Sequence, residues 1–249
     1  MIALTHLPSP YLDRCVLTHV DRQPIDFELA AAQHEAYRGA LQAAGYSVRI
    51  YDFNRSYADS VFVEDVAVVL DEVIVCGAMG VESREPELEG WRTRLREFGT
   101  VAELPPGAKL EGGDVLRIGH DLVIGKSTRT NVLAIEAVSA MVKQFGYAVH
   151  AVPVVGCLHL KTACTALDDH TLLVNPNWID IKSLPNKRLI IAADAWGANI
   201  VKLPDRILAN SQYVATIDQL KKHGFPLSTV DLSEFTKAEA GASCLSLLI

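Results

Sequence analysis

The chain has 249 residues, of which 23 are basic and 30 acidic, giving a formal net charge of −7. Hydrophobic residues make up 49% of it, which excludes disordered, collagen-like and low-complexity architectures. The acidic balance argues against a nucleic-acid-binding protein, because such proteins concentrate basic residues on one face.

Strand and helix patterns alternate along the chain. Helices are predicted where apolar residues are spaced by three and four, and strand–turn–strand phrases where two apolar runs flank a tight turn. In chain order we expect a strand (2–7), a helix (29–41), a strand (46–52), a hairpin (66–77), a helix (88–98), a strand (100–104), a hairpin (114–125), a helix (134–145), a strand (147–154), hairpins at 165–175 and 199–210, a helix (213–220), and a strand (225–232).

Glycine and proline mark the ends of these elements. A glycine follows each predicted helix, where it can adopt the left-handed conformation that ends helices; these residues are Gly45, Gly99, Gly146 and Gly224. The third hairpin is followed by a proline-broken stretch, 176–185, which predicts a short helix or none.

The recurring unit is strand, strand, helix, strand, and about five such units fit the chain. Units that cover each other's apolar faces can close into a ring. In that ring the N-terminal strand would complete the unit begun by the C-terminal segment 243–249. No linker or composition shift divides the chain, so we expect a single domain over residues 1–249; two stacked α/β lobes are the structural alternative.

Export and membrane signals are missing from the pattern. The first ten residues, MIALTHLPSP, lack a basic segment, and no apolar run approaches the roughly 20 residues of a spanning helix. The five cysteines form no C-x-x-C pair, which argues against a disulfide framework or a zinc ribbon. We therefore expect a cytoplasmic protein without a membrane partner, in which a thiol is free for chemistry.

Polar residues occupy corresponding places in the repeats, just before the first strand of each hairpin. They are Asp59, Glu64 and Asp65 in the first unit, Glu111 and Asp114 in the second, then His159, Asn199 and Cys244. If the ring closes, a nucleophile, an acid/base group and several anions converge in one pocket. Taken singly, Cys244 is better explained as a small buried apolar residue than as a nucleophile, and His159 as a hydrogen-bonded core histidine.

A set of motifs carries a resemblance to a known family. They are DSVFVED (59–65), LEGGDVL (110–116), KSTRTN (126–131), LHLKT (158–162), GAN (197–199) and GASCLSL (241–247). Together they resemble the dimethylarginine dimethylaminohydrolases of the guanidine-modifying superfamily, over nearly the whole chain. The resemblance implies an α/β fold, the five-bladed pentein propeller of ββαβ repeats with pseudo-fivefold symmetry.

The resemblance also implies roles for individual residues. Cys244 matches the nucleophile, His159 the acid/base histidine, and Glu111 the acid that contacts the guanidinium and orients the histidine. The substrate-binding positions are matched by Asp65 and Glu64 beside the guanidinium, Asp59 near the α-amino end, Arg84 and Arg129 at the α-carboxylate, Phe62 in the pocket wall and Leu17 in a lid. The chain departs from the family at CGAMG (76–80) and at Glu85, where a second arginine is common, and both departures bear on recognition of the amino-acid end.

The implied reaction is hydrolysis of an Nω-methylated arginine to citrulline and methylamine or dimethylamine, through a covalent thiouronium intermediate. It needs a small cationic guanidino substrate and no cofactor, and no metal-binding or phosphate-loop motif is present. A homodimer is a further expectation, from apolar residues on helix faces. The alternatives are arginine deiminase, another guanidine hydrolase or an amidinotransferase, and, in a different class, a non-catalytic pentein such as the ribosome anti-association factor.

Overall fold

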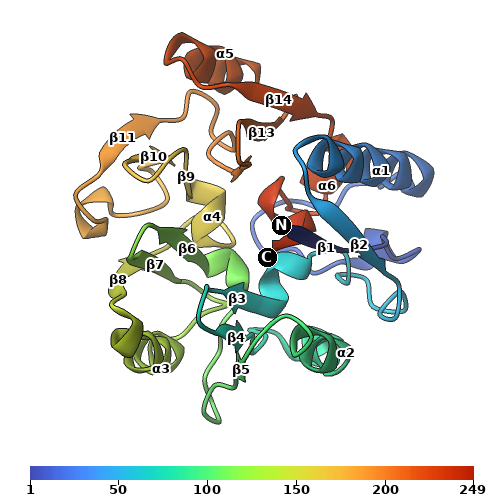
Figure 1. Ribbon diagram of the computed structural model, residues 1–249. Coiled ribbons are helices and arrows are strands. Elements are labelled where there is room, and N and C mark those ends of the chain that lie inside the picture. Colours follow the sequence, from blue (N-terminus) through green and yellow to red (C-terminus); the bar gives the residue numbers. More distant parts are fainter.

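The computed structural model describes residues 1–249, which form five three-stranded sheets arranged around one axis (Figure 1). In each sheet the first strand pairs antiparallel with the second, and the second pairs parallel with the third. In order, the sheets consist of β15 (Leu247–Leu248), β1 (Ile2–His6) and β2 (Ser47–Tyr51); β3 (Ala67–Val69), β4 (Ile74–Cys76) and β5 (Val101–Ala102); β6 (Val115–Ile118), β7 (Asp121–Lys126) and β8 (Ala148–Pro153); β9 (Cys164–Ala166), β10 (Thr171–Val174) and β11 (Arg188–Ile191); β12 (Ile200–Lys202), β13 (Ile207–Asn210) and β14 (Leu227–Val230). The predicted α/β propeller is therefore confirmed.

The helices follow from this strand pairing. A parallel pair needs a crossover connection, and a helix provides it between the second and third strands of four sheets. These helices are α1 (Phe27–Ala43), α2 (Glu87–Leu95), α3 (Val132–Val142) and α5 (Val214–Lys222). In the remaining sheet the crossover holds only a 3₁₀ turn, Ile181–Ser183, as the proline-broken stretch predicts.

The two ends of the chain close the ring. Strand β1 pairs with β15 in the register Ala3↔Leu248 and Leu4↔Leu247, and Ile2 and Ile249 exchange backbone hydrogen bonds of 2.6 and 2.8 Å. Figure 1 shows both ends near the centre. The expected completion of one unit by both ends is confirmed, and it places the C-terminal segment beside the axis.

Apolar clusters fill the spaces between neighbouring sheets and helices. One contains the fully buried Trp91 of α2 together with Leu4 of β1 and Leu247 of β15. It therefore joins the two ends of the chain to the second sheet. At about 25 cal/mol per Å² of apolar surface removed from water, such clusters are the main stabilising term of the ring.

The ends of the helices match the prediction with one exception. Gly45, Gly146 and Gly224 have φ values of +90°, +81° and +84°, as left-handed helix ends require. Gly99 does not, so that prediction is wrong: α2 ends at Leu95, and the chain leaves it through short-range turns such as Phe98 N–H to the Leu95 carbonyl at 3.0 Å. No helix is both long and apolar enough to span a bilayer.

Candidate active site

A single helical turn precedes the first strand of most sheets, and these turns surround the axis. They are the 3₁₀ turns Val63–Val66, Gly112–Asp114 and Ser243–Leu245 and the short helix α4 (Leu160–Ala163). The sequence did not predict the turns themselves. Most of the polar residues of the repeats lie in these turns or directly before them, so residues that are far apart in the chain meet at the centre.

One small pocket collects most of the predicted site residues. Its walls are Val16, Asp59, Phe62, Asp65, Arg84, Arg129, Leu158, His159, Ala238, Glu239, Ala240 and Cys244. Its volume is only about 20 Å³, which leaves room for about one water molecule. The structure is therefore a closed form of the pocket, and a substrate can enter only after part of the wall moves.

His159 and Glu111 form a buried pair behind the pocket. The imidazole Nε2 lies 2.7 Å from Glu111 Oε2, and Nδ1 lies 3.9 Å from Asp65 Oδ1. Glu111 is fully buried. The carboxylate thus fixes the orientation of the ring, as the resemblance implies for an orienting acid.

Neighbouring charges decide the protonation of this pair. Burial alone would lower the pKa of His159, but the carboxylates of Asp65, Asp114 and Glu111 outweigh it and raise that pKa to about 9. Burial would likewise raise the pKa of Glu111, but the hydrogen bond and charge of His159, with two arginines, lower it to about 2. At neutral pH the pair is an imidazolium beside a carboxylate.

Burial and nearby carboxylates hold the Cys244 thiol protonated. Burial, and then the charges of Glu64 and Asp65, raise its pKa well above that of a free thiol. The Gly241 N–H donates to Sγ at 3.4 Å and opposes this shift. At neutral pH Cys244 is therefore a thiol, and a cation bound beside it would favour the thiolate.

Asp65 is held from two sides. Its Oδ1 accepts from the Gly113 N–H at 3.1 Å, and its Oδ2 accepts from Arg84 Nη1 at 2.7 Å. A Cβ on Gly113 would lie 2.6 Å from His159 Nδ1 and 2.9 Å from Asp65 Oδ1. Glycine at this position therefore allows the imidazole and the carboxylate to pack together.

Arg84 forms ion pairs with carboxylates of the protein itself. It is buried, contacts Asp65 at 2.7 Å and Glu87 at 3.2 Å, and lies 3.9 Å from Glu111. Arg129 is also buried and lies 3.4 Å from Glu111. The structure thus brings both predicted carboxylate-binding arginines to the pocket, with Arg84 enclosed by anions.

Removing the charge of Arg84 should destabilise the fold strongly. We expect Arg84→Met to lower the free energy of unfolding by about 3 to 5 kcal/mol, because it leaves buried carboxylates without a counter-ion. Arg117→Met is the matched control, since Arg117 pairs with Asp71 at the surface and should cost less than about 1 kcal/mol. Urea denaturation measures both. Equal losses for the two variants would contradict the assignment.

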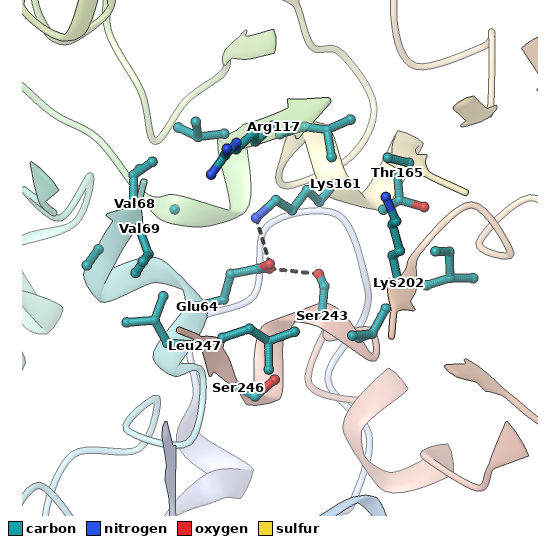
Figure 2. Close-up of a pocket in the computed structure, with 18 residues that line it drawn as sticks. Glu64, Val68, Val69, Arg117, Lys161, Thr165, Lys202, Ser243, Ser246 and Leu247 are labelled. Atoms are coloured by element: carbon teal, nitrogen blue, oxygen red, sulfur yellow. Dashed lines mark hydrogen bonds and ion pairs between the residues drawn. The ribbon is translucent and has the colours of Figure 1, made fainter. Parts of the chain in front are cut away.

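Glu64 lies apart from its neighbour Asp65. Its carboxylate accepts from Lys161 Nζ at 2.8 Å and from Ser243 Oγ at 2.7 Å, inside a second cavity of about 220 Å³ on the axis (Figure 2). Successive residues of a 3₁₀ turn point about a third of a turn apart, so the two carboxylates face different cavities. The structure does not bring the Glu64 side chain into the pocket of Cys244.

The remaining predicted residues form the outer wall. Asp59 accepts from the Val16 N–H at 3.1 Å, and Arg129 Nη2 donates to Thr18 Oγ1 at 3.2 Å. Leu17 is half-buried against the core and does not line the pocket itself. We call residues 16–19 the lid, because they cover the pocket next to Asp59 and Arg129.

The sequence pattern missed two groups near the site, Glu87 and Glu239, and assigned no role to a third, Asn199. Glu239 binds the lid, and Asn199 bonds to Ser243, the residue before Cys244, at 2.9 and 3.0 Å. Glu87 forms an ion pair with Arg84. Burial raises the pKa of Glu87 to about 7, despite the charge of Arg84. Asn199 stood at a repeat-equivalent place, but no spacing pattern marks Glu87 or Glu239.

A metal ion is poorly accommodated here. Ligand atoms of Asp65, Glu111 and His159 lie within 4.8 Å of one another. A metal would require neutral His159, whose raised pKa keeps it protonated, and it would stand beside the cations of Arg84 and Arg129. The donor set fits an acid/base pair better than a metal site.

Comparisons with known proteins place the chain in a family. Residues 12–171 match the family model described as RESC5, RNA-editing substrate-binding complex 5 protein, so this part of the chain falls within that family. N(G),N(G)-dimethylarginine dimethylaminohydrolase of Streptomyces coelicolor is 37% identical over 98% of this chain and 95% of its own length. The chain belongs to the dimethylarginine dimethylaminohydrolase family.

Solved structures of the family agree with this placement. A cysteine-to-serine variant of the dimethylarginine dimethylaminohydrolase of Pseudomonas aeruginosa, complexed with citrulline, superposes with a TM-score of 0.90 at 27% identity, covering 98% of this chain and 97% of that one. The bifunctional arginine dihydrolase/ornithine cyclodeaminase ArgZ of Synechocystis is 27% identical over 78% of this chain but only 30% of its own length. The family assignment of this chain therefore rests on its similarity to the dimethylarginine dimethylaminohydrolases.

Proposed function

We propose that the chain hydrolyses Nω-methylated arginine, and Nω,Nω-dimethylarginine in particular, to citrulline and the corresponding methylamine. One observation carries the proposal: the Cys244 thiol shares a closed pocket with Asp65 and with His159, whose imidazole is hydrogen-bonded to Glu111 behind the pocket. The family relation, over nearly the full length of the Streptomyces coelicolor enzyme, supports the same reaction.

The acidic pocket suits a guanidinium. A planar cation with several N–H donors is bound best by carboxylates, and Asp65 presents one beside Cys244. Held there, the guanidinium carbon stands before Sγ, which supplies the proximity that the reaction needs. The positive charge of the substrate also offsets the Glu64 and Asp65 charges that hold the thiol protonated.

The first half of the reaction forms a covalent intermediate. As the cation binds, the Cys244 thiol loses its proton to solvent water, and Sγ adds to the guanidinium carbon, giving a tetrahedral adduct. The bond from that carbon to the methylated nitrogen then breaks, and its electron pair takes the proton of His159, so that dimethylamine leaves. A thiouronium remains on Cys244, and His159 is neutral.

The second half regenerates the enzyme. Neutral His159 accepts a proton from a water molecule as the oxygen attacks the thiouronium carbon. The carbon–sulfur bond breaks, its electron pair returns to Cys244, and the sulfur takes up the hydroxyl proton of the adduct as the ureido carbonyl forms. Citrulline is released with the water oxygen in its ureido group, and both catalytic residues recover their starting protonation states.

At the other end of the substrate, we propose that Asp59 and Arg129 hold the α-amino and α-carboxylate groups. In the closed structure both residues bind the lid, so the substrate would replace those lid contacts. The assignments of Glu64, Arg84, Phe62 and Leu17 to substrate binding stay predictions. So do the single domain, the homodimer and the cytoplasmic location.

A citrulline assay with a small panel of guanidino compounds tests the function. We expect turnover with Nω,Nω-dimethylarginine and Nω-monomethylarginine at a kcat/KM at least about tenfold above that with arginine, a difference of about 1.4 kcal/mol in transition-state binding. Arginine as the best substrate would instead favour a deiminase. Transfer of the amidino group to an added amine would favour an amidinotransferase, and no turnover would contradict the proposal.

A further inference from the structure

The lid is tied to the segment that carries the nucleophile by one side chain, Glu239. Its Oε2 accepts from the Thr18 N–H at 2.7 Å and its Oε1 from the His19 N–H at 3.1 Å. These bonds join positions more than two hundred residues apart, and Glu239 stands five residues before Cys244. Each carboxylate oxygen thus holds one of two successive lid amides.

The surroundings give this carboxylate no other partner. Glu239 is buried, with 6% of its surface exposed, and takes part in no ion pair. A buried carboxylate without a counter-ion requires hydrogen-bond donors, and the lid amides are the donors present. The Glu239 side chain and the closed lid therefore stabilise each other.

The backbone of Glu239 is also unusual. With φ of +59° it is the one non-glycine residue of the chain in the left-handed region. Such a conformation disfavours most side chains and persists where surrounding contacts hold it, often at functional sites. Glycine would adopt this backbone conformation at a lower energetic cost. The strained backbone at Glu239 directs its carboxylate towards the lid amides.

The other lid contacts differ from this one. Val16 binds Asp59 and Thr18 binds Arg129, and both of these partners face the pocket that a substrate would occupy. A substrate that takes Asp59 and Arg129 removes those ties. Glu239 also borders this pocket, but each of its carboxylate oxygens already accepts from a lid amide, so a substrate held by Asp59 and Arg129 need not break these bonds. On its other side Glu239 borders a separate cavity of about 280 Å³ with Val20, Trp196 and Tyr213, which gives the side chain room to swing away.

We propose that Glu239 is the latch of the lid, a positioning residue that keeps residues 16–19 closed over a bound substrate and releases them to let it in. Because the closed pocket holds about one water molecule, each turnover requires the latch to open and close. The steady-state consequences rest on the proposed function, but the closure of the lid over Cys244 does not.

Glu239→Gln tests the latch by turning one acceptor into an amide that cannot accept from a lid N–H. We expect KM for Nω,Nω-dimethylarginine to rise about tenfold, the loss of one hydrogen bond to a charged acceptor, while kcat changes less than about threefold. Without substrate, we expect faster alkylation of Cys244 by iodoacetamide and faster hydrogen exchange of the amides of Thr18 and His19.

Two further variants make the result decisive. Glu239→Gly removes the carboxylate but suits the left-handed backbone, so it should keep its thermal stability and show the same changes as Glu239→Gln. Glu234→Gln is the matched control, because Glu234 is equally buried and accepts from the Asp26 N–H at 2.8 Å away from the pocket. It should leave KM, alkylation and exchange at the lid unchanged.

The latch would be overturned if both Glu239 variants left alkylation of Cys244 and exchange at Thr18 and His19 within about twofold of the Glu234→Gln control, well below the tenfold expected for such a bond. A fall in kcat with unchanged KM would also overturn it, because that result places Glu239 in the chemistry. If none of the proteins turned over methylated arginine, the substrate assignment would fail, while alkylation and exchange would still decide on the latch.

Discussion

Replacing Cys244 by serine should reduce kcat by on the order of 10⁴-fold or more, the scale seen when a nucleophile is lost. A serine hydroxyl in this acidic pocket has a far higher barrier to ionisation than the thiol, and no neutral base is available, because His159 is held protonated by its carboxylate neighbours. Binding should survive, since the carboxylates that would hold the guanidinium remain in place.

Another cysteine of the chain provides the control for this variant. Cys164, a buried cysteine of β9 in an apolar cluster, should tolerate Cys164→Ala with turnover nearly unchanged. Steady-state citrulline formation and calorimetric binding of dimethylarginine measure the two properties separately. If Cys244→Ser kept more than about a tenth of wild-type kcat, covalent catalysis by this residue would be wrong.

Replacing His159 by glutamine should lower kcat by about 10²- to 10⁴-fold, the usual contribution of a general acid–base group. Glutamine can keep a hydrogen bond to Glu111, but it cannot protonate the leaving amine or take a proton from water. The variant should therefore stall before amine release or accumulate the thiouronium on Cys244. Mass spectrometry of the quenched protein distinguishes these two stalling points.

His150→Gln provides the comparison, because His150 also pairs with a carboxylate, Asp121 at 2.8 Å, but at the surface. Its kcat should match wild type. A His159→Gln enzyme with kcat within about threefold of wild type would remove the acid–base assignment, since even a weak general acid contributes more.

The pH dependence of wild type should follow the same group. His159 has its pKa raised to about 9, so the imidazolium that protonates the amine is present at neutral pH and kcat should fall as pH rises through about 9. The fold responds with the same sign. A pKa above the unfolded value of about 6.5 contributes stability that is complete below that pH and is lost as pH rises towards 9.

Much of the fold could be predicted because its signals are local. Each hairpin and each long helix has its own apolar period, and the completion of one sheet by both ends follows from the number of repeats. The prediction of a left-handed helix end at Gly99 was wrong because a helix can end through short-range turns without a left-handed residue.

The site could be predicted in part. Asp65, His159 and Cys244 stood at repeat-equivalent places, so ring closure brings them together. Glu64 also occupies a repeat-equivalent place in the sequence, but the 3₁₀ turn directs its side chain into the cavity of about 220 Å³ and away from Cys244. Glu239 lies outside the repeat-equivalent set, and its partners in the lid are set only by the folded chain.

The proposed mechanism requires a covalent bond between Cys244 Sγ and the guanidinium carbon. Rapid acid quenching of wild-type enzyme during the first turnover of Nω,Nω-dimethylarginine, followed by peptide mass spectrometry, tests it directly. We predict that the peptide containing Cys244 gains the mass of the substrate less dimethylamine, and that dimethylamine appears before citrulline. Citrulline formed with no adduct at any quench time, or with the adduct on another cysteine, would contradict the account.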